Sequence, residues 1–184
     1  MTFMEIIEFT RKARSHYLDP LGKFLLKLKL TANQFTGLSL ILGLLGAYFL
    51  FQNNILFAVF ILLHLFADGL DGVLARLSQP TTFGKYFDSI TDQFIGFLLL
   101  LKIYFYLNDY FVVIILSLFI LTYLIHWGSK MTYPVIFVRT GLAIPLLFFP
   151  LWPTLITTGT YLIVGGFIIY GVIKQLRFFL STKI

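Results

Sequence analysis

Six apolar runs follow one another between residues 32 and 174, and each is long enough to cross a lipid bilayer. The hydrocarbon core of a bilayer is about 30 Å thick, so about 20 apolar residues span it as a helix. The runs cover roughly residues 32–51, 55–76, 84–106, 110–128, 135–151 and 155–174. We therefore predict an all-α integral membrane protein with six transmembrane helices.

The composition agrees with a single membrane domain over residues 1–184. Hydrophobic residues make up 59% of the chain and charged residues 12%, and no polar stretch is long enough for a soluble domain. Without cysteine, the chain has neither disulfides nor thiolate chemistry. The basic residues border the apolar runs, so the net charge of +6 indicates an anionic membrane surface or anionic substrates, and no nucleic acid.

Residues 2–18 precede the first apolar run and have the pattern of an amphipathic helix on the membrane surface. At ~100° per residue, apolar side chains share one arc and charged side chains lie opposite. The apolar arc holds Phe3, Ile6, Ile7, Ala13 and Tyr17, and the opposite side holds Glu5, Glu8 and Lys12. We expect this helix to end at Asp19-Pro20, because a proline disfavours helical geometry in the residue before it.

The distribution of basic residues predicts the orientation in the membrane. Thirteen of the fourteen Lys and Arg residues fall on one side of the six-helix core 32–174, and only Lys102 falls on the other. Cytoplasmic loops are enriched in Lys and Arg. We therefore predict a multi-pass protein of the cytoplasmic membrane, with both termini and the turn near Pro80 in the cytoplasm.

Four of the eight acidic residues lie within one stretch of 25 positions that contains this turn: Asp68, Asp71, Asp88 and Asp92. A carboxylate in a membrane segment costs ~2.5–3.5 kcal/mol to insert, so it needs a partner or a function. The outer two aspartates lie twelve residues from Pro80 and the inner two lie eight or nine. In two antiparallel helices of equal rise, these distances bring the carboxylates to matching depths. The spacings i,i+3 and i,i+4 also place each pair on one helix face.

Four converging carboxylates would repel one another strongly. At an effective dielectric constant near 20, two like charges ~4 Å apart repel by roughly 4 kcal/mol. Either several carboxylates are protonated or cations lie between them. Oxygen ligands without His or Cys favour Mg²⁺, with Mn²⁺ or Ca²⁺ as alternatives. Two such ions ~3.5–4 Å apart would suit phosphoryl transfer.

The residues around the aspartates resemble the signature of the CDP-alcohol phosphatidyltransferases, Asp-x2-Asp-Gly-x2-Ala-Arg-x8-Gly-x3-Asp-x3-Asp. The chain supplies the fixed positions in order, as Asp68, Asp71, Gly72, Ala75, Arg76, Gly84, Asp88 and Asp92. It departs from the signature in having seven residues instead of eight between Arg76 and Gly84. The missing residue falls at the tip of the hairpin, where a change of one residue in length is most easily accommodated by the helix ends. The six runs and the surface helix are also similar to that family.

The resemblance implies a role for each of these positions. Two Mg²⁺ or Mn²⁺ ions would be bound by Asp68, Asp71, Asp88 and Asp92. Asp92 would also be the general base, which takes the proton of an acceptor hydroxyl as that hydroxyl attacks the β-phosphorus. The cytidine and diphosphate of a CDP-linked alcohol would be received by Gly72, Ala75, Arg76 and Gly84. Close helix packing is the alternative explanation for the glycines.

Asn33 and Thr36 open the first apolar run at the cytoplasmic level. The family often has Pro-Asn-x-x-Thr here as part of the nucleotide pocket, and this chain has Ala32 in place of the proline. The resemblance therefore implies that Asn33 and Thr36 contribute to CDP binding. The alternative is a helix start capped by Thr31 or Asn33.

Lys130 and Arg139 flank the turn between the fourth and fifth runs. Relatives that take a phosphorylated polyol place basic residues in this region, which implies that the pair binds the phosphate of the acceptor. The alternative is that they only set the topology. His64 lies one turn before Asp68 and is either a hydrogen-bond donor to the site or a packing residue.

The resemblance implies an enzyme that moves a phosphatidyl-type group from CDP-diacylglycerol, or an ether-lipid equivalent, to a small alcohol with release of CMP. Transfer from CDP-choline or CDP-ethanolamine to diacylglycerol uses the same signature and stays an alternative. A divalent-cation or proton transporter is a further interpretation, which the single depth of the aspartates disfavours. Glycines at 165, 166 and 171 would allow close helix contact within the subunit or in a homodimer.

Overall fold

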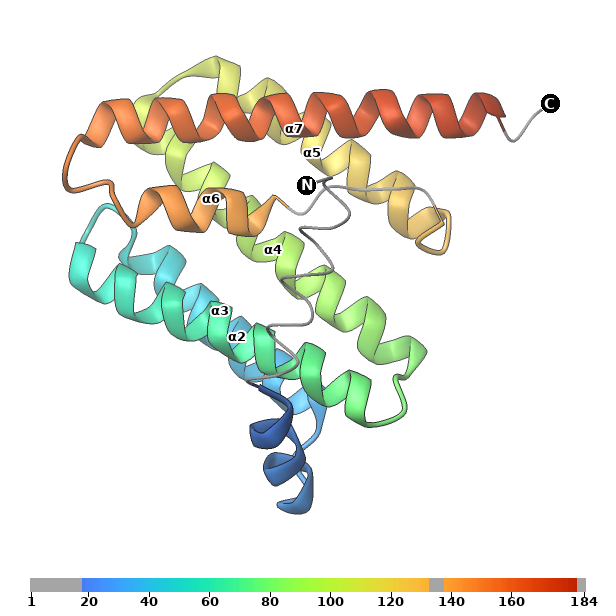
Figure 1. Cartoon of the computed structure of the whole chain (residues 1–184). Coiled ribbons are helices and arrows are strands. Elements are labelled where there is room, and N and C mark those ends of the chain that lie inside the picture. The colour runs from blue at the N-terminus through green and yellow to red at the C-terminus, as the bar shows by residue number, and fades with distance from the viewer. Residues whose placement is uncertain (1–17, 133–137, 182–184) are drawn as a thin grey trace, which may run out of the picture.

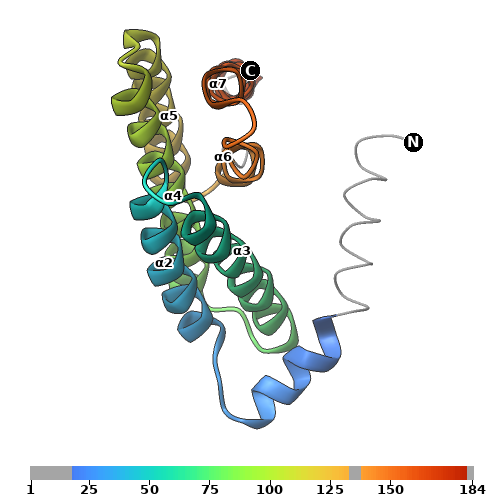
Figure 2. The ribbon, with the colours of Figure 1, turned by 90° about the vertical axis from the view of Figure 1, so that its left-hand side faces the viewer.

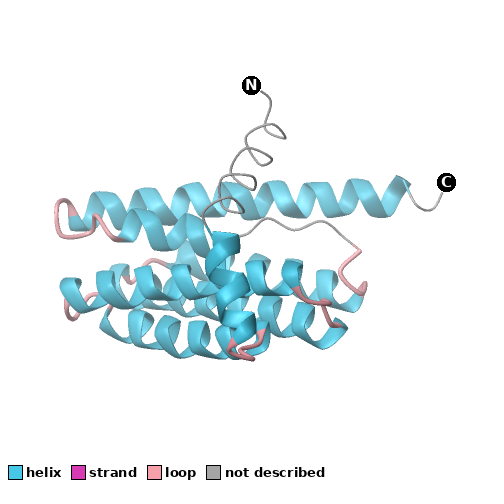
Figure 3. Cartoon of the chain, turned by 60° about the horizontal axis from the view of Figure 1, so that its bottom comes forward, coloured by secondary structure: helices cyan, strands magenta, loops and turns pink. Residues whose placement is uncertain are grey.

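The computed structural model describes residues 18–132 and 138–181, and all regular secondary structure in these residues is helical (Figure 3). The helices are α2 (Ala32–Phe49), α3 (Asn54–Leu77), α4 (Thr82–Leu107), α5 (Tyr110–Gly128), α6 (Arg139–Leu146) and α7 (Pro153–Ser181). Five of them, all except α6, are long and apolar enough to cross a membrane. The prediction of an all-α membrane protein is confirmed.

The fifth predicted span, 135–151, is not a single long helix in the residues that the structure describes. Helix α6 has eight residues, which makes about 12 Å of helix and is too short to cross a bilayer. Pro145 lies inside α6 and has no backbone N–H to donate, and the chain continues as turns and a bend from residue 147 to residue 152. Residues 133–137 are outside the described part, so the number of spans stays a prediction.

The predicted surface helix 2–18 lies outside the described residues except for Leu18. The described chain is helical over residues 18–27, so the helical geometry does not stop at Asp19-Pro20 as expected. Contact with α3 explains this difference: a Cβ added to Gly22 would lie 2.7 Å from Val73 Cγ1. Packing against α3 therefore outweighs the local preference of the Asp-Pro sequence.

Side-chain caps determine where the helices begin. Each capping side chain accepts a hydrogen bond from a backbone N–H of the first turn, and the four caps are Thr31, Asn53, Thr81 and Asp109. Thr31 and Gln34 form a reciprocal capping box at the start of α2. The cap of α2 is thus Thr31, which leaves the side chain of Asn33 available for other contacts.

The connections between helices gather at two ends of the molecule. Figure 1 shows the α2–α3, α4–α5 and α6–α7 connections towards the left, and the α3–α4 turn and the end of α5 towards the right. Lys102, the lysine that opposes the other basic residues in the sequence, donates to the carbonyl of Tyr48 at 2.9 Å and contacts that of Leu50 at 3.5 Å. It therefore interacts with the carboxyl end of α2, where a positive charge is favourable.

Helix α4 is the centre of the bundle and contacts α2, α5, α6 and α7 (Figure 2). Its side chains Ile95, Leu99 and Ile103 are fully buried in the apolar core. Helices α3 and α4 diverge from their shared turn, and α2 packs against both of them (Figure 1). The two helices of the predicted hairpin are therefore not closely paired along their length.

Candidate active site

A cavity of about 760 Å³ lies beside the α3–α4 turn. Four separate stretches form its walls: the start of α2, the end of α3, the start of α4 and the turn after α5. The lining includes five residues that the sequence analysis assigned to CDP binding, namely Asn33, Thr36, Gly72, Ala75 and Gly84. Asp71, Asp88, Lys85 and Lys130 line the same cavity. Its volume is in the range of small-molecule binding sites.

Three of the four predicted carboxylates form a compact group. Asp68, Asp88 and Asp92 each offer an oxygen such that the three oxygens lie within 4.8 Å of one another. Asp71 is outside this group and lines the cavity together with Asp88. Three carboxylates with no nitrogen or sulfur ligand among them fit a hard divalent cation such as Mg²⁺. The donor set is therefore compatible with the metal that the sequence analysis predicts.

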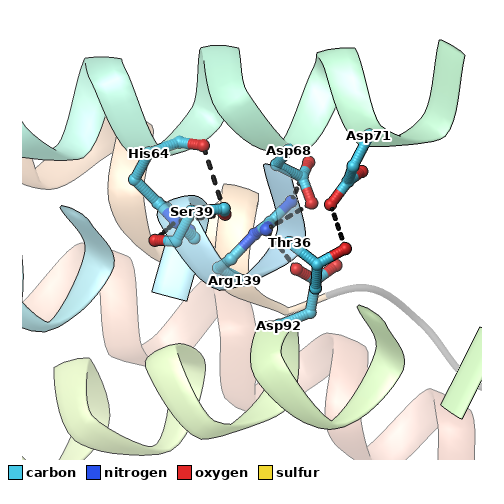
Figure 4. Close-up of polar contacts among 7 residues, drawn as sticks. All are labelled: Thr36, Ser39, His64, Asp68, Asp71, Asp92 and Arg139. Atoms are coloured by element: carbon cyan, nitrogen blue, oxygen red, sulfur yellow. Dashed lines mark hydrogen bonds and ion pairs between the residues drawn. The ribbon is translucent and has the colours of Figure 1, made fainter. Parts of the chain in front are cut away.

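The guanidinium of Arg139 joins two members of this carboxylate group (Figure 4). Its Nη1 and Nη2 donate to the two oxygens of Asp68 at 2.8 Å and 2.6 Å, and Nη1 also donates to Asp92. Arg139 is 6% exposed and is the first residue of α6, so α6 brings this charge into the bundle. A two-pronged contact of this kind is a strong, charge-assisted arrangement. The protein therefore supplies one positive charge to the pair of carboxylates of Asp68 and Asp92.

Helix α2 contributes two polar side chains to the cavity. Thr36 Oγ1 donates to the carboxylate of Asp71 at 2.8 Å and is 2% exposed (Figure 4). Asn33 lies next to α4 at Gly84, where an added Cβ would be 2.8 Å from Asn33 Oδ1 and 3.0 Å from Thr81 Oγ1. The absence of a side chain at Gly84 is thus required for Asn33 to line the cavity.

The basic residues assigned from the sequence have different surroundings. Arg76 is exposed, and its Nη1 lies 3.9 Å from the position that a Cβ on Gly72 would take. Its guanidinium therefore lies over a glycine that lines the cavity. Lys130 lines the cavity directly, whereas Arg139 does not line it and instead contacts Asp68 and Asp92. The structure does not bring Lys130 and Arg139 together as one pair.

His64 is fully buried and joins α3 to α2. Its Nδ1 lies 2.8 Å from the carbonyl oxygen of Ser39 and 2.9 Å from Ser39 Oγ (Figure 4). Because a carbonyl only accepts, we assign the proton to Nδ1. Nε2 has no hydrogen-bond partner among the described residues. The structure therefore gives His64 a role in helix packing and shows no hydrogen bond from it to an aspartate.

Sequence reasoning did not find the contacts of Arg139, Thr36 and Ser39. An arginine within an apolar run is a signal, because charged side chains inside a membrane protein usually pair with one another. That rule predicts a carboxylate partner for Arg139, although it does not say which one. No sequence signal connects Thr36 to Asp71, because the two residues belong to different helices.

Comparisons with known proteins agree on one family. The family described as CDP-alcohol phosphatidyltransferase matches residues 29–176. An uncharacterized protein of Aquifex aeolicus is 39% identical over 90 residues, which cover 46% of this chain and 46% of that protein. The archaetidylinositol phosphate synthase of Pyrococcus horikoshii is 38% identical over 78 residues, covering 41% of this chain and 42% of the relative.

A further relative is the bifunctional IPC transferase and DIPP synthase of Aquifex aeolicus. It is 36% identical over 70 residues, which cover 38% of this chain and 16% of that protein. The aligned stretches therefore span less than half the length of each of these three curated relatives.

Proposed function

The chain belongs to the CDP-alcohol phosphatidyltransferase family, and we propose that it is a transferase that synthesises a phospholipid. It moves the phosphatidyl-type group of a CDP-linked lipid, CDP-diacylglycerol or an ether-lipid equivalent, to the hydroxyl of a small polar acceptor, and CMP leaves. The observation that carries this proposal is the shared cavity, which is lined by residues of the CDP signature and by two of its aspartates.

Divalent metal ions, Mg²⁺ or Mn²⁺, are proposed as the cofactor, with two ions per site. Asp68, Asp88 and Asp92 would hold one ion, and Asp71 would complete a second site with Asp88. The oxygen-only donor set supports this assignment. Bound ions would neutralise the phosphate oxygens and the departing CMP.

Asp92 is proposed as the general base. It accepts the proton of the acceptor hydroxyl, whose oxygen attacks the β-phosphorus of the CDP group. The bond from that phosphorus to the bridging oxygen breaks, and CMP leaves with the electron pair. The burial of Asp92 supports this role, because at 7% exposure its carboxylate is largely screened from water that would compete for the transferred group.

The two substrates are assigned to different parts of the site. The CDP group is proposed to contact Asn33, Thr36, Gly72, Ala75, Arg76 and Gly84, all of which line or border the cavity. Arg139 is proposed to serve the acceptor, because it contacts Asp92, towards which the acceptor hydroxyl must point. The name of the archaeal relative supports a phosphorylated polyol, inositol phosphate, as that acceptor.

We place the site at the cytoplasmic face of the membrane and treat the chain as one membrane domain. The cavity lies at the α3–α4 turn, and Arg76 and Lys85 flank this turn. Cytoplasmic loops are enriched in such residues. Partners of the site are therefore a lipid of the inner leaflet and a soluble alcohol.

The proposed function is tested by supplying the purified protein with CDP-diacylglycerol or its ether-lipid equivalent and measuring CMP. We expect CMP release with Mg²⁺ and an acceptor from the panel of inositol phosphate, glycerol phosphate and serine. EDTA should abolish this release and added Mg²⁺ should restore it. Release only with CDP-choline or CDP-ethanolamine and diacylglycerol would support the alternative transfer. No CMP from any combination, together with Mg²⁺ flux into liposomes, would support the transporter.

Replacing Gly84 with alanine should weaken CDP binding roughly tenfold, about the free energy of one lost hydrogen bond. The added methyl group would displace Asn33 and Thr81, since both lie within 3.0 Å of its position. Isothermal titration of CDP in the presence of Mg²⁺ measures this. The matched control is Gly159→Ala, where an added Cβ meets nothing within 4 Å. Equal CDP affinity in Gly84→Ala and the control would contradict the assignment of Asn33 and Gly84.

A further inference from the structure

Lys130 lies in a different part of the site from Arg139. Lys130 lines the same cavity as Thr36, Asp71 and Gly72, whereas Arg139 is absent from the lining. The two terminal nitrogens of Arg139, Nη1 and Nη2, donate to aspartates, and its side chain is 7% exposed. Lys130, in contrast, is an exposed residue at the edge of the cavity. The two residues therefore lie in different surroundings within the site.

The backbone at Lys130 has an uncommon conformation that is held by hydrogen bonds. Lys130 and Met131 have φ values of 54° and 61°, in the left-handed region that non-glycine residues rarely adopt. Such conformations persist where the surroundings fix them. The Lys130 and Met131 N–H groups donate to the carbonyls of Trp127 and His126, at 3.0 Å and 2.8 Å. Both residues line the cavity, so this strained turn positions Lys130 at its edge.

The end of α5 is also attached to the helix that carries the carboxylates. Trp127 Nε1 donates to Ser89 Oγ at 3.2 Å, and Ser89 follows Asp88 directly in α4. The turn that carries Lys130 is therefore fixed relative to Asp88. Lys130 is therefore held in a defined position, from which it can bind an anion in the cavity.

The cavity is lined by both acidic and basic side chains, which suits an anionic ligand that binds together with metal cations. Asp71 and Asp88 line the cavity, and Lys85 and Lys130 line it as well. In the described part of the chain, no carboxylate forms a salt bridge with Lys130. An ammonium group without a carboxylate partner is available to a phosphate oxygen. A nucleoside diphosphate bound together with Mg²⁺ would offer such an oxygen to Lys130.

We propose that Lys130 binds the diphosphate of the CDP-linked donor and not the phosphate of the acceptor. This inference rests on the proposed function, and it changes one assignment made from the sequence, where Lys130 and Arg139 share the acceptor. The ammonium group contacts an oxygen of the β-phosphate, which distinguishes CDP from CMP. Lys130 is thus a binding residue for the donor, and the acceptor is left to Arg139.

The test measures the affinity of Lys130→Met for CDP and for CMP, with Mg²⁺ present and no acceptor. A charge-assisted hydrogen bond contributes ~1.5–3 kcal/mol, so we expect CDP affinity to fall at least about tenfold while CMP affinity changes much less. Lys130→Arg should keep most of the affinity. In steady-state assays, Lys130→Met should raise the KM for the CDP-lipid and leave the KM for the acceptor unchanged. The matched control is Lys174→Met, an exposed lysine of α7 outside the cavity.

The outcomes separate this inference from the proposed function. If the unmodified protein does not bind CDP, the proposed function and the inference both fail. If it binds CDP and Lys130→Met binds CDP equally well, only the inference fails. A rise in the acceptor KM without a change in the donor KM would return Lys130 to the acceptor. Normal CMP binding by Lys130→Met would show that the variant is folded.

Discussion

Replacing Asp92 with asparagine should abolish transfer while largely preserving binding of the CDP-linked donor. Asparagine keeps an oxygen where the carboxylate had one, so it remains a weak metal ligand, but it cannot accept a proton from the acceptor hydroxyl. General base catalysis contributes typically 10²–10⁴-fold, so CMP release should fall by about that factor or more. CMP release at saturating substrates measures the loss, and titration of CDP with Mg²⁺ measures the binding that remains.

Asp109 provides the matched control for this substitution. It lies at the opposite end of α4 from the site, where it caps α5 through Phe111 N–H and accepts a hydrogen bond from Tyr161 at 2.6 Å. Asparagine is as good a cap as aspartate, so Asp109→Asn should retain both turnover and stability. Turnover in Asp92→Asn comparable with that of the control would remove Asp92 from the role of base.

The positions of the helices could be predicted where local signals were strong. The fourth run was predicted over residues 110–128, and α5 covers Tyr110–Gly128. Asn108 adopts a left-handed conformation at the end of α4, and Asp109 caps the start of α5. Two adjacent residues therefore determine this boundary. The rise of a helix and the number of residues from the turn predicted matching depths for the four aspartates, and the structure brings three of them together, Asp68, Asp88 and Asp92, with Asp71 outside this group.

The arrangement of the helices could not be predicted in the same way. Counting residues from Pro80 suggested two closely paired helices, but α3 and α4 diverge and α2 packs against both. The contact between Arg139 and Asp68 joins residues 71 positions apart, and the contact between Thr36 and Asp71 joins residues 35 apart. Such contacts depend on how the helices pack in three dimensions, and periodicity along one helix carries no information about them. The short length of α6 depends in the same way on Pro145 and on the packing around it.

The structure divides the site into a part around Arg139 and a part that lines the cavity. Asp68 and Asp92 form the first part, where both carboxylates accept hydrogen bonds from the guanidinium of Arg139. Asp71, Asp88 and Lys130 form the second part and line the cavity. Asp88 belongs to both parts, because its carboxylate is also within reach of Asp68 and Asp92. The proposed acceptor and donor would therefore meet at Asp88, each approaching from its own side.

Replacing Arg139 with methionine should produce the largest loss of stability in this chain. Methionine fills a similar volume, but it leaves the part-buried carboxylate of Asp68 and the buried carboxylate of Asp92 without the cation that now contacts both. Removing one partner of a buried ion pair costs ~3–5 kcal/mol, because the remaining charge is poorly solvated. The free energy of unfolding in detergent with EDTA should fall by about that amount. Chemical unfolding followed by tryptophan fluorescence measures it.

Divalent metal should restore much of this loss, because a cation held by the same carboxylates supplies the charge that methionine lacks. A ligand that binds only the folded protein stabilises it in proportion to the logarithm of its concentration over its dissociation constant. The gain on adding Mg²⁺ should therefore be larger in Arg139→Met than in the unmodified protein, because the ion no longer competes with a guanidinium. The double variant Arg139→Met with Asp68→Asn removes one of the unpaired charges and should be more stable in EDTA than Arg139→Met alone. Arg76→Met, which changes an exposed arginine, is the control and should unfold as the unmodified protein does. If Arg139→Met unfolds like this control in EDTA, the charges of Asp68 and Asp92 are balanced by something other than Arg139.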